Sequence, residues 1–305
     1  MVRQCNDLRR KTGARRGQGE TGTMRLVDWD ARKRKIETGD GRTIAYIDTD
    51  TPGSAVVLIH GFTDSSLSFA LLEPYLPDVR LIMPDLRGHG ASHRPDDAYR
   101  LADFAEDIAC FMDGLGLREA FVVGHSLGAS TAMQLAATRP ELVGALAVIS
   151  GTLRPNTDEN DPICAAMAML RDPIDPAHEF FATWHACASP VDAAFLTMLA
   201  RDAAAIPARL WSRIFQEIRS CDLRGIASRI QQPALIVHGS ADPLFSVSQA
   251  YALRAYLRSG DMIELPGCGH NPHWERPGRV AGSLQGFLAR HLRQSASRSI
   301  AGLFE

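Results

Sequence analysis

Residues 121–128 constrain the fold of this chain more than any other stretch. The apolar residues 121–123 are typical of a buried strand, Gly-X-Ser-X-Gly follows around Ser126, and an alanine-rich, helix-forming run occupies residues 129–138. A serine on a sharp turn between strand and helix adopts strained backbone dihedrals, and the glycines two positions before and after it leave room for the turn. We therefore expect Ser126 to stand clear of a sheet, in front of a helix N-terminus that favours negative charge.

The segments around this turn alternate between strand and helix patterns. Strands are expected at residues 55–59, 79–83, 143–149, 233–237 and 262–265, and helices at 65–76, 101–115, 246–257 and 279–292. Upstream, residues 33–38 and 43–48 flank Asp40-Gly41, a dipeptide typical of a hairpin turn. This alternation predicts an α/β fold, with a mostly parallel, doubly wound sheet.

The alternation stops between residues 151 and 225, where no strand pattern appears. Candidate helix starts in this stretch carry a proline at or near the first helical position, at Pro162, Pro176, Pro190 and Pro207. We therefore expect a helical cap, residues 151–225, inserted into a core that consists of residues 24–150 and 226–293. The arginine-rich residues 1–23 are expected to be a disordered extension, with Met24 as an alternative start, and residues 294–305 a C-terminal tail.

The composition argues against several classes of protein. The formal net charge is −2, and the sequence has no broad basic field that would bind the folded protein to nucleic acid. No apolar run approaches the roughly 18 residues that span a bilayer, and no apolar segment follows the N-terminal arginines as in a secretory signal. We expect a cytoplasmic protein without a membrane or nucleic-acid partner, and the sequence leaves monomer and dimer open.

The cysteines and histidines lack the spacing of a metal site. The six cysteines include no C-x-x-C pair, which predicts reduced and mostly buried thiols. His178 and His185 are seven residues apart, but no third ligand is evident. Neither a metal nor another cofactor is expected.

Two further residues complete a catalytic triad with Ser126. A serine hydroxyl needs a base within hydrogen-bond reach, and that base needs a third group to orient it. In open parallel sheets the functional loops follow the carboxyl ends of the strands. Asp242 follows the strand at 233–237 and His270 follows the strand at 262–265, in the chain order Ser, Asp, His. We expect Ser126 as nucleophile, His270 as base and Asp242 as the orienting acid.

The negative charge that develops on a substrate carbonyl needs donors that are already aimed at it. The backbone N–H of Leu127, directly after the serine, supplies one, and the backbone N–H of Phe62, in the loop after the strand at 55–59, supplies the other. The predicted cap has many bulky apolar residues and no cluster of Arg or Lys that would hold a phosphate or CoA group. We expect the substrate pocket to be lined by Phe62, Leu127, Phe181, Trp184, Met198, Phe215 and Leu244.

Five sequence blocks in this order resemble those of the α/β-hydrolase superfamily. They are His60–Thr63, Pro84–Ser92, Gly124–Gly128, His238–Asp242 and Gly269-His270. The resemblance covers roughly residues 33–292 and implies a single-domain serine hydrolase with a helical cap, similar to esterases and lactonases. It also implies the roles given above to the triad and to the two backbone donors.

The hypothesis that these residues favour is hydrolysis of a medium-sized, largely hydrophobic carboxylic ester or lactone through an acyl-enzyme on Ser126. The alternative is a carbon–carbon bond hydrolase of ring-fission products, which uses the same triad, although the sequence after His60-Gly61 departs from the Gly-rich pattern of those enzymes. A third hypothesis is that the protein is a small-molecule receptor of the same fold. Haloalkane dehalogenases and epoxide hydrolases need Asp where this chain has Ser126.

Overall fold

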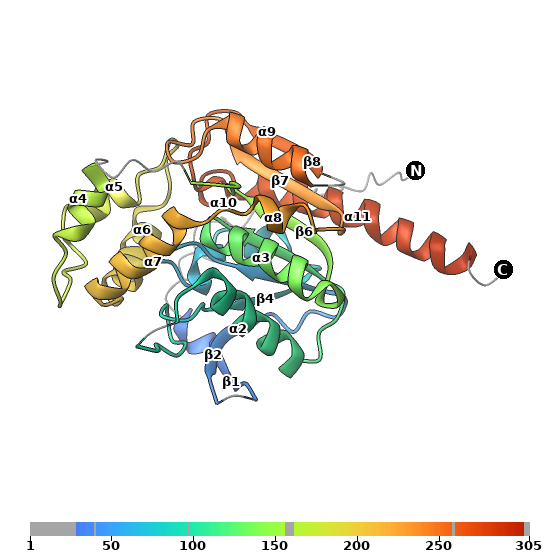
Figure 1. Cartoon of the computed structure of the whole chain (residues 1–305), viewed down its shortest axis with the longest axis horizontal. Helices are drawn as coiled ribbons and strands as arrows, with labels where there is room; N and C mark the ends of the chain where they lie inside the picture. Colours follow the sequence, from blue (N-terminus) through green and yellow to red (C-terminus); the bar gives the residue numbers. More distant parts are fainter. Residues whose placement is uncertain (1–28, 40, 97, 156–161, 258–259, 302–305) are drawn as a thin grey trace, which may run out of the picture.

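An eight-stranded sheet forms the centre of the computed structural model, which describes residues 29–39, 41–96, 98–155, 162–257 and 260–301 (Figure 1). Its strands are β1 Arg34–Glu37, β2 Thr43–Asp48, β3 Ala55–Ile59, β4 Arg80–Pro84, β5 Ala120–His125, β6 Val143–Ile149, β7 Ala234–Gly239 and β8 Gly260–Leu265. They lie in the order β1-β2-β4-β3-β5-β6-β7-β8. The pairs from β4 to β8 are parallel, and β2 pairs antiparallel with β1 and β4. The predicted mostly parallel α/β sheet is therefore confirmed.

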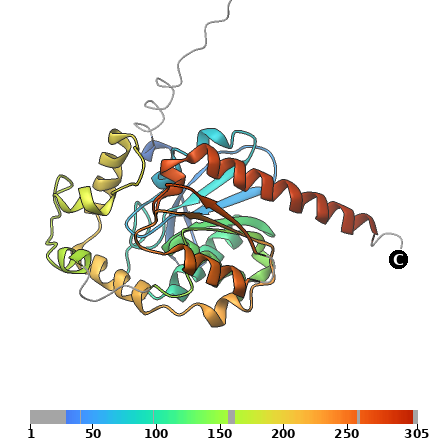
Figure 2. The same cartoon turned by 90° about the horizontal axis from the view of Figure 1, so that it is seen from above.

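Helices cover both faces of the sheet. They are α2 Leu101–Gly114, α3 Leu127–Thr138, α8 Arg224–Ala227, α9 Val247–Tyr256, α10 Pro272–Glu275 and α11 Pro277–Ala301. Successive strand residues point to opposite faces, so Val57 and Ile59 pack with α2, α3 and α9, whereas Val56 and Leu58 pack with α11. Figure 2 shows α11, in red, lying along one side of the sheet and extending beyond it. Burial on both faces explains the continuous apolar character of β3, of β6 and of residues 120–123 in β5.

The helices that follow β6, before the short helix α8, form what we call the helical insertion: α4 Pro162–Ala168, α5 Phe180–Trp184, α6 Ala193–Ala204 and α7 Ala208–Ser220. They gather on one side of the molecule, away from the C-terminal end of α11 (Figure 1). Helix α4 begins at Pro162 and α7 directly after Pro207, as predicted. The starts expected at Pro176 and Pro190 are wrong: α5 begins at Phe180, and α6 begins after Asp192, whose carboxylate accepts the N–H of Phe195.

Two further expectations differ from the structure. Residues 65–76 form two short 3-10 helices, η2 Ser66–Phe69 and η3 Glu73–Tyr75, instead of one α-helix. The hydroxyl of Ser65 accepts the N–H of Leu67, and Pro74 has no N–H to continue an α-helical ladder. Helix α11 continues to Ala301, so it includes much of the stretch expected to be a tail. The predicted extension, residues 1–23, lies outside the described residues.

Candidate active site

Ser126 stands on a sharp turn between β5 and α3. Its backbone has φ 51° and ψ −112°, and its N–H donates to the carbonyl of Ile149 at 3.0 Å, which ties the turn to the neighbouring strand. A Cβ atom on Gly124 would meet the carbonyl of Gly128, and one on Gly128 would meet the carbonyl of Ile59. Both positions therefore need glycine, and the strained turn places the serine hydroxyl at the carboxyl edge of the sheet.

Asp242 and His270 lie at the same edge, on the loops after β7 and β8. His270 Nδ1 is 2.8 Å from Asp242 Oδ2, and His270 Nε2 is 3.0 Å from Ser126 Oγ. The other carboxylate oxygen of Asp242 accepts the N–H groups of Leu244 and Phe245. Burial acts to raise the pKa of Asp242, but the nearby His270 and these hydrogen bonds outweigh it and leave the pKa below its usual value. An ionised Asp242 holds the proton on Nδ1 and leaves Nε2 free to accept from Ser126.

This geometry can support nucleophilic chemistry at a carbonyl carbon. A serine hydroxyl that donates to an unprotonated imidazole nitrogen can lose its proton as the oxygen attacks. In the part of the chain that the structure describes, the backbone N–H groups of Phe62 and Leu127 donate to no protein acceptor. Both lie next to the carboxyl edge, one in the loop after β3 and the other at the first residue of α3.

Two buried histidines brace the loops around this edge. His60 Nδ1–H donates to the carbonyl of Gly61, and its Nε2 accepts the N–H of Leu86. His125 Nε2–H donates to the carbonyl of His270 at 3.0 Å. Burial lowers the pKa of each imidazole to about 3, so both are neutral near pH 7. His125 therefore connects the turn that carries the serine to the loop that carries His270.

A buried carboxyl group lies behind His125, and sequence reasoning missed it. Asp64 accepts a hydrogen bond from Ser68 Oγ at 3.0 Å and lies 4.0 Å from His125 Nδ1. Ser68 Oγ is also 3.1 Å from His273 Nε2. Burial raises the pKa of Asp64 to about 7, although the hydrogen bond from Ser68 opposes the shift. No local sequence signal separates this Asp from a solvated loop residue, because His125, the ring beside it, comes from a distant part of the chain.

Glu275 is a second buried acid that the sequence did not point to. One carboxylate oxygen accepts the N–H of Gly269 at 2.9 Å, and the other accepts the N–H of Ser189 at 2.8 Å. Gly269 directly precedes His270, whereas Ser189 lies in the segment that leads from α5 to α6. This side chain therefore links the His270 loop to the helical insertion.

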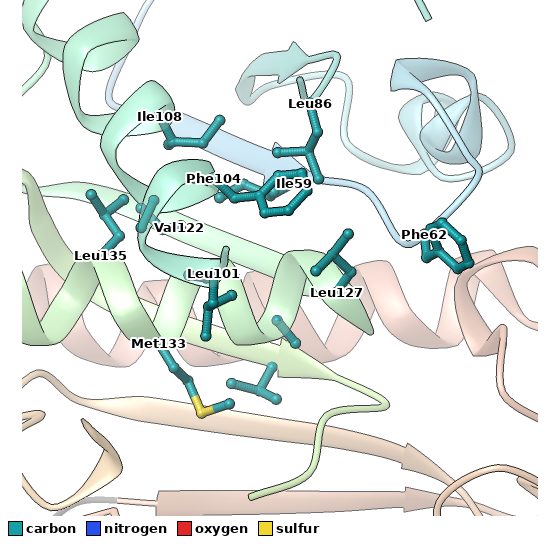
Figure 3. Close-up of a cluster of buried hydrophobic side chains, with 14 of the residues drawn as sticks. Ile59, Phe62, Leu86, Leu101, Phe104, Ile108, Val122, Leu127, Met133 and Leu135 are labelled. Carbon is teal, nitrogen blue, oxygen red and sulfur yellow. The ribbon is translucent and has the colours of Figure 1, made fainter. Parts of the chain in front are cut away.

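Aromatic side chains of the insertion surround Phe62. Its ring centroid lies 5.7 Å from Trp184, 5.4 Å from Trp211 and 6.3 Å from Phe215. Figure 3 shows Phe62 on the loop that leaves β3 beyond Ile59, apart from the side chains of α2. Phe181 and Leu127 belong to the same hydrophobic cluster. Five of the seven predicted pocket residues are thus brought together in one cluster.

The other two predicted pocket residues lie elsewhere. Leu244 is 44% exposed, and its neighbour Phe245 is the residue whose ring meets His270, edge-on at 5.2 Å. The hydrogen bonds from the N–H groups of both residues to Asp242 set this orientation of the loop. Met198 packs in the cluster on the opposite face of the sheet, with Phe195 on the same helix.

The described residues contain no group of three or more His, Cys, Asp or Glu side chains that could hold a metal ion. In the same residues, no helix is both long and apolar enough to cross a membrane. Burial raises the pKa of the thiols of Cys187, Cys221 and Cys268.

Comparison with known proteins points to one family. The model of the alpha/beta hydrolase family matches residues 56–283. The 2-(acetamidomethylene)succinate hydrolase of Mesorhizobium japonicum is 31% identical over 248 residues, 75% of this chain and 86% of that protein. A haloalkane dehalogenase of the same organism is 36% identical over 106 residues, 34% of each protein. The enol-lactonase structure from Burkholderia xenovorans has a TM-score of 0.73 at 21% identity and covers 84% of this chain and 100% of that one, which shows a shared fold.

Proposed function

The chain belongs to the alpha/beta hydrolase family, and on that premise we propose that it hydrolyses a carboxylic ester or lactone of a medium-sized, largely hydrophobic substrate. The observation that carries the proposal is the hydrogen-bonded series Asp242–His270–Ser126, with distances of 2.8 and 3.0 Å at the carboxyl edge of the sheet. This order of acid, imidazole and hydroxyl is the one that a serine nucleophile needs.

The proposed reaction passes through an acyl-enzyme. Ser126 Oγ attacks the substrate carbonyl carbon while His270 Nε2 takes the hydroxyl proton, and Asp242 stabilises the resulting imidazolium. His270 then returns the proton to the leaving alcohol oxygen, and the acyl group stays on Ser126. Water, activated by His270, attacks this ester and releases the acid and the free serine. A lactone follows the same steps with the alcohol still tethered to the acyl group.

We assign the oxyanion hole to the backbone N–H groups of Phe62 and Leu127. Both are without a protein acceptor in the described residues, and Leu127 is the first residue of α3, where the helix dipole favours negative charge. Loss of one such donor typically costs roughly 100- to 1000-fold in rate.

We propose that the insertion forms the cap over this site, and its side chains favour a hydrophobic substrate. Its aromatic residues Trp184, Trp211 and Phe215 meet the ring of Phe62. Two of the three arginines of α7, Arg209 and Arg213, are exposed and lie on the other side of that helix from the buried Trp211 and Ile214. A largely uncharged acyl or alcohol group fits these surroundings better than a phosphate.

The alternative reaction is cleavage of a carbon–carbon bond in a ring-fission product, since the same three residues can serve it. The relative from Mesorhizobium japonicum, named as a hydrolase of 2-(acetamidomethylene)succinate, adds that compound to the candidates.

Turnover of a substrate panel tests the proposal. The panel contains p-nitrophenyl esters of increasing chain length, several lactones, 2-(acetamidomethylene)succinate and ring-fission diketones, each with wild type and Ser126→Ala. We expect wild type to hydrolyse an ester or lactone and Ser126→Ala to be silent. Turnover of the diketones alone would favour the carbon–carbon hydrolase. Ligand binding that changes protease sensitivity without turnover would favour a receptor.

A further inference from the structure

Three helices of the insertion contact the loop that carries the proposed oxyanion donor. The ring of Phe62 packs against Trp211 and Phe215 on α7. Thr63 Oγ1 accepts the indole N–H of Trp184, on α5, at 2.7 Å. Ser65 Oγ–H donates to Asp202, on α6, at 2.5 Å. The insertion therefore reaches this loop through side chains, next to the backbone N–H of Phe62.

Thr63 is the strained residue of the loop. Its φ is 69°, in the left-handed region that β-branched residues rarely adopt. Its side chain is fully buried, and within the described residues Trp184 is the partner of its hydroxyl. A strained conformation persists only where surrounding contacts determine it, and the indole N–H is such a contact. Thr63 directly follows Phe62, so a fixed Thr63 anchors the peptide unit that joins the two residues, next to the unit that carries the Phe62 N–H.

We propose that Trp184 is a positioning residue of the insertion: its indole N–H, through Thr63, holds the backbone N–H of Phe62 in the orientation that an oxyanion needs. This inference rests on the proposed function, because it concerns the same oxyanion hole. An oxyanion donor acts when it lies about 2.7–3.1 Å from the developing charge, and a misplacement near 1 Å can cost about 100-fold. The aromatic contact of Trp184 with Phe62 is separate from this role.

Trp211 provides a matched control. It lies in the same aromatic cluster, with its ring 5.3 Å from Trp184 and 5.4 Å from Phe62. Its indole N–H donates to the carbonyl of Ala203, so that bond stays inside the insertion. Trp184→Phe and Trp211→Phe thus make the same chemical change in one cluster, and the first alone releases Thr63.

The rate at which a fluorophosphonate labels Ser126 tests the proposal without a known substrate. Ser126 Oγ attacks phosphorus and displaces fluoride, its proton passes to His270, and negative charge develops on the phosphoryl oxygen. We expect Trp184→Phe to lower the maximal labelling rate about 10-fold or more relative to Trp211→Phe, with similar reagent affinity. Thr63→Val should reproduce this loss, whereas Thr63→Ser should stay within about 2-fold of wild type because it keeps the acceptor.

A double variant and the pH profile separate positioning from general damage. Trp184→Phe combined with Thr63→Val should label no more slowly than either single variant, since both remove one interaction. The pH dependence of labelling should be unchanged, because His270 and Asp242 are untouched. If Trp184→Phe does not fold, as judged by circular dichroism, the labelling rates of Thr63→Val and Thr63→Ser test the proposal instead.

Equal labelling rates of Trp184→Phe and Trp211→Phe would overturn the inference, as would a loss in reagent affinity alone. For an unfolded Trp184→Phe, equal rates of Thr63→Val and Thr63→Ser would overturn it. Failure of the proposed function looks different, because wild type would then turn over no ester or lactone of the panel, whatever the labelling rates of the variants.

Discussion

Replacement of Asp242 by asparagine should leave His270 unable to act as a base while keeping the shape of the site. One oxygen of Asp242 accepts the N–H groups of Leu244 and Phe245, at 2.8 and 3.0 Å. The amide oxygen of asparagine must take that position, since an NH₂ group there would face two donors. The NH₂ group then points to His270 Nδ1, which has to accept. His270 therefore carries its proton on Nε2 and can no longer take the proton of Ser126.

The expected loss is about 10⁴-fold in kcat, which corresponds to about 5.4 kcal/mol of transition-state stabilisation. The two hydrogen bonds from the loop are kept, so the loss in unfolding free energy should not exceed about 1.5–3 kcal/mol, the contribution of one charge-assisted hydrogen bond. Initial rates with the best substrate of the panel, together with urea unfolding, measure both quantities.

Asp222→Asn is the control, because Asp222 is also a hydrogen-bonded carboxylate but pairs with Arg224 at the surface. Its rate should equal that of wild type. Retention of more than about a tenth of the activity by a folded Asp242→Asn variant would refute the assignment of Asp242 as the group that sets the tautomer of His270.

Two further outcomes follow from the buried acids. Glu275→Gln should lower the unfolding free energy by about 1.5–3 kcal/mol, because one of the two buried N–H groups loses its acceptor. Equal urea midpoints for this variant and for the exposed control Glu141→Gln would contradict this prediction. Asp64 has a pKa of about 7 when folded against an ordinary 3.8, so the native chain binds more protons than the unfolded chain between about pH 4 and 7. Its contribution to stability therefore falls as the pH rises through that window. The unfolding free energy of Asp64→Asn, measured against pH, should rise relative to that of wild type by up to about 4 kcal/mol between pH 4 and 7. Above pH 7 the two curves should be parallel. Parallel curves throughout would show that Asp64 ionises normally.

The sequence by itself determined the sheet and the place of its reactive edge. Strand residues such as 55–59 and 143–149 are apolar throughout because both of their faces are buried, so a local pattern suffices to find them. The carboxyl ends of parallel strands meet at one edge, so the loops with Ser126, Asp242 and His270 could be assigned to one site before any distance was known.

The tertiary structure alone decided which side chains pair across loops. Trp184 and Thr63 are 121 residues apart, and Glu275 and Ser189 are 86 apart. Local patterns likewise could not choose Phe245 over Leu244 as the neighbour of His270, because the direction of that loop depends on its hydrogen bonds to Asp242. The spacing of apolar residues along the sequence indicates which residues are buried. A pairing between distant side chains exists only after the helices have packed, so no local pattern in the sequence predicts it.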